Sequence, residues 1–200
     1  LEKALKVFPI HIKEKIILDV GASTGGFTHC ALLNGAQKVY AVDVGYGQLA
    51  WELRQDSRVI PMERFNIRYI APEKLNELVD ISTIDVSFIS LKKVLPAVIK
   101  CLKPDGEIIA LIKPQFEAGK DKVGKKGVVR DPNVHQDVLI SIVNDSEKMG
   151  LFASGLTYSP IKGPQGNIEY LIWLKRDRNY KEHKLKSFIP LLVEEAHSLL

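Results

Sequence analysis

The sequence has few cysteines and no long apolar run. Two of its 200 residues are cysteine, Cys30 and Cys101, and their spacing fits neither a CxxC motif nor a zinc site. We therefore expect both to be reduced core residues, with no disulfide and no metal, as is typical of cytoplasmic proteins. No apolar run approaches the roughly 20 residues that cross a bilayer, and no signal-peptide pattern is visible. These absences favour a cytoplasmic protein with no membrane partner.

A strong charge of either sign is also missing. The formal net charge is +4, and hydrophobic residues make up 46% of the chain. So mild a positive charge permits nucleic-acid binding without indicating it. A chain of this length and composition can bury the core of one domain, so residues 1–200 are expected to form one. The sequence opens on a helical pattern without an initiator methionine, and we expect a piece of a longer protein.

Strand-like and helical patterns alternate along the chain. Runs rich in β-branched residues predict seven strands, at 16–20, 38–43, 58–62, 81–86, 107–112, 154–160 and 168–175. Helical patterns fill the gaps, at 2–7, 26–34, 46–55, 72–78, 91–102, 133–149 and 183–199. Short links between alternating elements indicate a parallel sheet with helices on both faces. The last two strands are close enough to form a hairpin, so we predict a Rossmann-like, mostly parallel α/β sheet with one antiparallel strand.

The most informative segment follows the first predicted strand. Residues 16–27 read IILDVGASTGGF, an apolar run that ends in Asp19 and leads into a glycine-rich turn. Open α/β sheets bind ligands at this edge. We expect Gly21, Gly25 and Gly26 to let a ligand lie against the backbone. Asp43 ends the second predicted strand, where it would accept hydrogen bonds from both hydroxyls of a ribose.

Two cofactors that contain a nucleoside, NAD and S-adenosylmethionine, are candidates for this site. Dinucleotide oxidoreductases use G-x-G-x-x-G, whereas here the glycine pair comes four and five residues after Gly21. Asp19 would repel a dinucleotide phosphate and suits a ligand with a cationic amino group. S-adenosylmethionine (SAM) has that group and a ribose, so the pattern favours SAM over NAD. A tight turn with a capping aspartate is the structural alternative.

The predicted cofactor site extends to later loops. Asn66, after the third strand, is placed where an amide reads adenine N6 or N1, and its alternative role is to cap a loop. The whole predicted set is Asp19, Gly21, Ser23, Thr24, Gly25, Gly26, Phe27, Asp43, Val44, Asn66 and Asp85.

Three ionisable residues lie at other predicted strand ends. Asp85 ends the fourth strand, Lys113 follows the fifth, and Glu169 comes just after the hairpin turn. A lysine directly after five apolar residues is costly to desolvate, so neighbouring carboxylates would hold its charge. Such a lysine can take the proton of a ribose 2′-hydroxyl while the oxygen attacks the SAM methyl. The alternative is a structural salt bridge at the strand edge.

An irregular polar segment follows the fifth predicted strand. Residues 115–131 contain three glycines and five basic residues, Lys120, Lys122, Lys125, Lys126 and Arg130. A basic, glycine-rich loop at a strand end predicts either a mobile lid or a surface that contacts phosphates. An ordinary solvated loop is the alternative.

Four motifs resemble the hemolysin A (TlyA) type of FtsJ-like methyltransferases. They are DVGASTGGFT at 19–28, VDVGYGQL at 42–49, DVSFISL at 85–91 and KPQFEAG at 113–119. The resemblance runs from the first helix to about Leu174. It implies SAM-dependent 2′-O-methylation of a cytidine ribose in ribosomal RNA. It also implies that ribosomal RNA is bound through loop 115–131 and an S4-type domain upstream of this chain.

The resemblance further implies a catalytic Lys-Asp-Lys-Glu set. Asp85, Lys113 and Glu169 match its last three members, whereas the first lysine would precede Leu1. We therefore expect this chain to bind SAM but to methylate RNA poorly or not at all. Because family members are also called hemolysins, a membrane-active protein stays open as an alternative. So does a non-catalytic RNA-binding factor that retains SAM only structurally.

Overall fold

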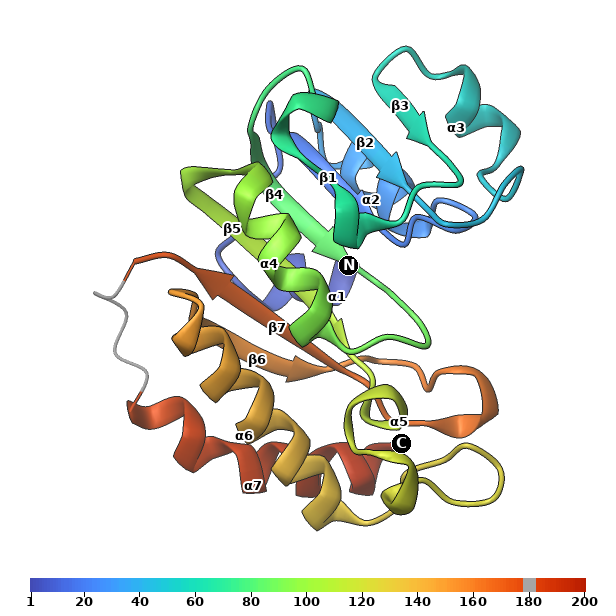
Figure 1. The fold of residues 1–200 in the computed structure, drawn as a ribbon. Coiled ribbons are helices and arrows are strands. Elements are labelled where there is room, and N and C mark those ends of the chain that lie inside the picture. The colour runs from blue at the N-terminus through green and yellow to red at the C-terminus, as the bar shows by residue number, and fades with distance from the viewer. Residues whose placement is uncertain (178–182) are drawn as a thin grey trace.

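The computed structural model describes residues 1–177 and 183–200. A single seven-stranded sheet runs through it in the order β3-β2-β1-β4-β5-β7-β6 (Figure 1). Its strands are β1 (Ile16–Val20), β2 (Lys38–Val42), β3 (Val59–Met62), β4 (Val79–Ile84), β5 (Leu102–Ile112), β6 (Phe152–Tyr158) and β7 (Tyr170–Lys175). β7 runs antiparallel to both of its neighbours, whereas the other pairs are parallel. The predicted sheet with one reversed strand is confirmed.

Helices cover both faces of the sheet (Figure 1). One face packs against α1 (Glu2–Val7), α2 (Gly26–Leu33) and α3 (Trp51–Gln55), the other against α4 (Leu91–Cys101), α6 (Pro132–Lys148) and α7 (His183–Leu199). All five residues of β1 are buried. Ile17 belongs to one core and Leu18 to the other, because successive strand residues point to opposite faces. This double burial explains why the strands read as continuous apolar runs.

Two of the predicted helices are shorter in the structure. The helix expected at 46–55 begins only at Trp51, because Gly47 adopts a left-handed φ of +71° before it. The helix expected at 72–78 is reduced to the 3-10 turn η2 (Pro72–Lys74). After this turn the chain becomes extended and buries a leucine in the core, so tertiary packing overrides the helical pattern.

Strand β5 begins earlier than its sequence pattern indicates. It starts at Leu102 rather than at residue 107. The partner residues on β4 shift between Val79 and Ile81, so the segment around Gly106 bulges out of the ladder. A Cβ at Gly106 would lie 3.0 Å from the Lys103 carbonyl oxygen. Gly106 therefore serves a bulge within a strand.

Candidate functional site

A large cleft lies at the carboxyl ends of the central parallel strands. Its volume is about 1010 Å³, and it is bordered by the turns that follow β1, β2, β4 and β5. Six of the predicted cofactor residues line it: Gly21, Ser23, Asp43, Val44, Asn66 and Asp85. The other five, Asp19, Thr24, Gly25, Gly26 and Phe27, lie outside this lining.

Asp19 is enclosed rather than exposed to the cleft. Its side chain has no solvent exposure. One carboxylate oxygen accepts a hydrogen bond from the Thr28 hydroxyl at 2.6 Å, and the other accepts from the Thr83 hydroxyl at 2.9 Å. Burial raises the pKa of this carboxyl to about 6. Asp19 ties α2 to β4 beneath the glycine turn in this structure, and its contact with the cofactor stays a prediction.

The three glycines of this turn differ in backbone conformation and in what surrounds them. Gly21 has a φ of +84°, and a Cβ there would lie 2.2 Å from the Asp85 carbonyl oxygen. Gly25 has a φ of +99°, and its Cβ would lie 2.2 Å from a methyl carbon of Leu53. The positive φ and these close contacts by themselves require glycine at both positions. At Gly26 no described atom lies within 4 Å of an added Cβ, so this position faces open space.

Asp43 faces the cleft, as its position at a strand end predicts. Its Oδ2 accepts a hydrogen bond from the Ser23 backbone N–H at 2.8 Å, and its Oδ1 accepts from Gly45 N–H at 2.7 Å. A carboxylate has about four lone-pair sites, so it can still accept from two more donors. Its neighbour Val44 is 69% exposed and offers an apolar surface beside it.

Asn66 and Thr24 both make hydrogen bonds within the protein, and their contacts with the cofactor stay predictions. Asn66 caps the 3-10 turn η1 (Ile67–Tyr69), accepting hydrogen bonds from the backbone N–H and the side-chain Nε of Arg68 at 3.1 and 3.2 Å. Its oxygen is thus engaged, and only its Nδ2 is left to donate toward the cleft. The backbone carbonyl of Thr24 accepts from Ala50 N–H at 3.1 Å, which makes Thr24 part of the turn's support.

The three predicted catalytic residues gather at a second, smaller pocket. This pocket measures about 510 Å³ and is lined by Asp85, Lys113 and Glu169. The Lys113 ammonium forms an ion pair with Asp85 at 2.6 Å and also donates to the Ser87 hydroxyl at 3.0 Å. The lysine side chain is only 12% exposed. Asp85 lines both pockets, so it stands on the wall that they share.

Glu169 closes the opposite side of the smaller pocket. It is 5% exposed and accepts a hydrogen bond from Gln115 Nε2 at 3.2 Å. Burial raises the pKa of Glu169, while the Gln115 hydrogen bond and the charge of Lys113 oppose that rise. A Cβ on Gly163 would lie 2.3 Å from the carboxylate, so this glycine lets the β6–β7 turn lie over Glu169. Phe27 also lines this pocket rather than the larger cleft.

The basic segment 115–131 is attached to the rest of the fold. Asn167 accepts from Val129 N–H at 3.0 Å and donates to the Gly127 carbonyl at 2.9 Å. The His135 ring contacts the Val129 carbonyl at 2.9 Å, and because a carbonyl only accepts, Nε2 carries the proton there. These contacts fix the second half of the segment. They argue against a mobile lid in this half, whereas the phosphate-contacting surface stays a prediction beside the ordinary solvated loop.

The structure adds one aromatic pair that sequence reasoning missed. Phe88 lies in the turn after β4, is 91% exposed, and has a φ of +64°. Its ring lies 5.0 Å from that of Phe116, and both residues line the larger cleft. An exposed phenylalanine with a positive φ is a feature typical of functional sites. Its signal in the sequence, an aromatic residue in a turn beside Asp85, was present in the DVSFISL motif.

The fold and its two pockets are typical of α/β enzymes that bring a nucleoside-type ligand and a second substrate together at the carboxyl ends of parallel strands. Residues 1–176 match the family model of FtsJ-like methyltransferases. The chain belongs to this family.

Close relatives agree with the family. Bacillus subtilis YqxC is 53% identical over 203 residues, covering 100% of this chain and 72% of YqxC. The 16S/23S rRNA (cytidine-2'-O)-methyltransferase TlyA of Mycobacterium tuberculosis is 47% identical over 195 residues, covering 96% of this chain and 73% of TlyA. A solved structure from Streptococcus thermophilus that carries the name hemolysin is 45% identical with a TM-score of 0.95, covering 99% of this chain and 72% of that chain.

Proposed function

We propose that this chain is the catalytic part of an enzyme that binds SAM in the larger cleft and methylates the ribose 2′-oxygen of a cytidine in ribosomal RNA. One observation carries the proposal: the ion pair of Asp85 and Lys113 stands where the two pockets meet. Methyl transfer needs the cofactor in one pocket and the acceptor in the other, with the acceptor oxygen aligned toward the methyl group at the boundary between them. The names of the relatives supply ribosomal RNA and cytidine as the acceptor.

The cleft residues fit SAM. Asp43 retains lone pairs for two ribose hydroxyls after its two backbone hydrogen bonds. The amide Nδ2 of Asn66 donates toward adenine N1, and exposed Val44 packs on the ring. Asp19 acts from below by holding the turn at Gly21. When bound, SAM supplies an electrophilic methyl group on its sulfonium, whose carbon–sulfur bond breaks with the electron pair remaining on sulfur.

The three residues of the smaller pocket have different roles in proton transfer. Lys113 is the group that takes the proton of the acceptor hydroxyl, because its amine reaches the wall between the pockets. The Lys113 ammonium first releases its own proton to solvent, and the neutral amine then accepts the hydroxyl proton as the oxygen attacks the methyl group. Asp85 holds that amine at 2.6 Å. Glu169, buried on the far side, orients the acceptor hydroxyl. Taking a proton in this way contributes about 100-fold or more to such reactions.

The surroundings of both pockets suit RNA. Besides Lys113, the lysines that line them are Lys3, Lys6, Lys93, Lys120 and Lys162. Lysines in such an arrangement neutralise backbone phosphates. The exposed ring of Phe88 offers a face on which an unstacked base can lie. RNA contact through segment 115–131 extends this basic surface.

The first test is cofactor choice. Calorimetric titration with SAM and with NADH is expected to show binding of SAM only. Binding of NADH alone would contradict the proposal, because the glycine spacing and Asp43 were assigned to SAM.

The second test is catalysis. We expect Lys113→Ala to abolish tritiated methyl transfer to ribosomal subunits while SAM still binds, and the exposed Lys100→Ala on α4 to keep full activity. The assay uses the protein with its native residues upstream of Leu1. Leu1 lines the smaller pocket, and we propose that a lysine preceding it enters there. Full transfer by Lys113→Ala would remove this lysine from the mechanism, and mapping of 2′-O-methyl sites would identify the nucleotide.

A membrane-active role is the second candidate, because one solved relative carries the name hemolysin. Within residues 1–177 and 183–200, no helix combines the length and apolarity needed to cross a membrane. Red-cell lysis by the purified protein without SAM would support this candidate, and we expect none. The cytoplasmic location and the upstream S4-type domain stay predictions.

A further inference from the structure

Two turns carry the proposed catalytic pair. The turn at 85–90 follows β4 and holds Asp85, whereas the one-turn helix α5 (Pro114–Glu117) follows β5 directly after Lys113. Neither turn belongs to the strand ladder, which ends at Ile84 and Ile112. A helix of one turn is not stable by itself. The geometry of the pair therefore depends on contacts between the two turns.

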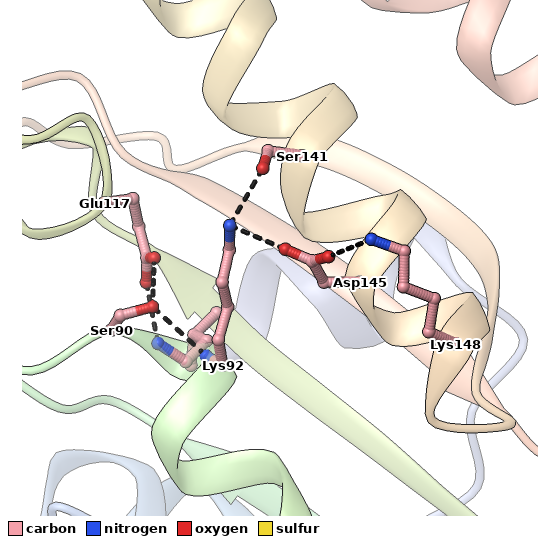
Figure 2. Close-up of polar contacts among 7 residues, drawn as sticks. Ser90, Lys92, Glu117, Ser141, Asp145 and Lys148 are labelled. Carbon is pink, nitrogen blue, oxygen red and sulfur yellow. Dashed lines mark hydrogen bonds and ion pairs between the residues drawn. The ribbon is translucent and has the colours of Figure 1, made fainter.

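Glu117 makes the contact at the far end of α5 (Figure 2). Its Oε2 accepts a hydrogen bond from the Ser90 hydroxyl at 2.6 Å, and its Oε1 accepts from Leu91 N–H at 2.7 Å. Ser90 is also the N-cap of α4 and accepts from Lys92 N–H at 3.2 Å. A carboxylate at a helix N-terminus is favoured by the helix dipole, so Glu117 joins α5 to the start of a long, packed helix.

The contact of Glu117 with Ser90 and Leu91 requires a carboxylate to be buried, which costs desolvation free energy. Burial raises the pKa of the Glu117 carboxyl, against the hydrogen bonds from Ser90 and Leu91 that favour its charged form. An apolar side chain would fill the same space without that cost. Glu117 also lines neither pocket, so it does not itself meet either substrate. Its role is therefore to hold the two turns together.

We propose that Glu117 is a positioning residue for methyl transfer, fastening the turn that carries Lys113 to the turn that carries Asp85. The inference rests on the proposed function. The two turns meet at three places along α5: at Lys113 with Asp85, at Phe116 with Phe88, and at Glu117 with the start of α4. Loss of the last contact leaves α5 and its N-cap residue Lys113 less firmly held against the turn at 85–90, which moves the Lys113 amine.

Figure 2 also shows a matched control on the same helix turn. Lys92 donates to the Ser141 hydroxyl at 2.8 Å and pairs with Asp145 at 2.6 Å, which joins α4 to α6. These contacts lie beside the Glu117 contact and join no residue of α5, although the charge of Lys92 also favours the charged form of Glu117. Lys92→Ala therefore removes a comparable polar link from α4 without releasing Lys113.

The experiment measures kcat and the KM for SAM in Glu117→Ala, Glu117→Gln and Lys92→Ala, together with urea stability. A shift of about 1 Å in a reacting group costs about 100-fold, so we expect Glu117→Ala to lose about that much in kcat. The KM for SAM is expected to change less than about threefold, because the cofactor contacts at Asp43 are intact. The glutamine amide can accept from Leu91 and donate to Ser90, so Glu117→Gln is expected to restore kcat to within about threefold.

Three outcomes would overturn the inference: a near-normal kcat in Glu117→Ala, an equal loss in Lys92→Ala, or no rescue by glutamine. If Glu117→Ala does not fold, Glu117→Asp replaces it, since the shorter side chain reaches only one of the two donors and should lose about tenfold. Lys113→Ala separates the two proposals. If it abolishes transfer while Glu117→Ala does not reduce it, only this inference fails; if it retains transfer, the proposed function fails.

Discussion

Replacing Asp19 by asparagine gives the sharpest test of how the glycine turn is supported. Burial raises the pKa of this carboxyl from 3.8 to about 6. The folded protein thus binds a proton more tightly than the unfolded chain. The contribution of the Asp19 carboxyl to the free energy of unfolding is then largest below pH 3.8 and is lost as the pH rises through about 6. The change in pKa corresponds to about 3 kcal/mol between the two protonation states.

An asparagine at this position would resemble the protonated carboxyl at every pH, because the Thr28 and Thr83 hydroxyls can each turn to donate or accept. Asp19→Asn should therefore be near neutral at about pH 4 and stabilising by up to about 3 kcal/mol at about pH 8. Urea unfolding across this range measures the difference. Asp105→Asn, at an exposed position in β5, is the control for removal of a carboxylate.

The same variant tests whether Asp19 contacts the cofactor. With both oxygens bonded to hydroxyls of the protein, the substitution should leave the Kd for SAM within about threefold, a change below about 1 kcal/mol. A tenfold weaker Kd would show that the carboxylate meets SAM directly. A stability difference that stays constant between acid and neutral pH would refute the reasoning from burial.

Three further substitutions test other parts of the site. Gly21→Ala should destabilise the fold by about 1–3 kcal/mol in urea unfolding, because its Cβ would lie 2.2 Å from the Asp85 carbonyl oxygen. Asp43→Asn should weaken SAM binding about tenfold by calorimetry, near 1.4 kcal/mol, because the amide turns a donor toward a backbone N–H. Asn167→Ala should speed tryptic cleavage of segment 115–131, because it leaves the buried Val129 N–H and the Gly127 carbonyl unpaired.

Each of these has a clear contrary result. Wild-type stability in Gly21→Ala would mean that the turn moves away from Asp85 at no cost. An unchanged Kd for SAM in Asp43→Asn would place the ribose elsewhere. Unaltered cleavage in Asn167→Ala would mean that segment 115–131 is held by other contacts, which would weaken its interpretation as a fixed basic surface.

Local pattern was enough to predict the sheet and the edge where the site lies. Parallel strands buried on both faces read as short apolar runs, and the residue after each run falls at a carboxyl end. Asp43, Asp85 and Lys113 could therefore be assigned to one edge of the sheet by their positions in the chain. Helix bounds were less predictable, as at Trp51, because a short helix depends on its tertiary contacts more than on its own pattern.

The amino-acid sequence by itself thus determined the fold class, the reversed strand and the strand-end residues, since all of these follow from local periodicity. Only the tertiary structure decided what each residue contacts. Asp19 is enclosed because two hydroxyls from distant elements meet it. The basic segment is held by Asn167, and Glu117 joins two turns that follow different strands. Such contacts depend on how strands and helices pack in three dimensions, and no local pattern in the chain encodes that.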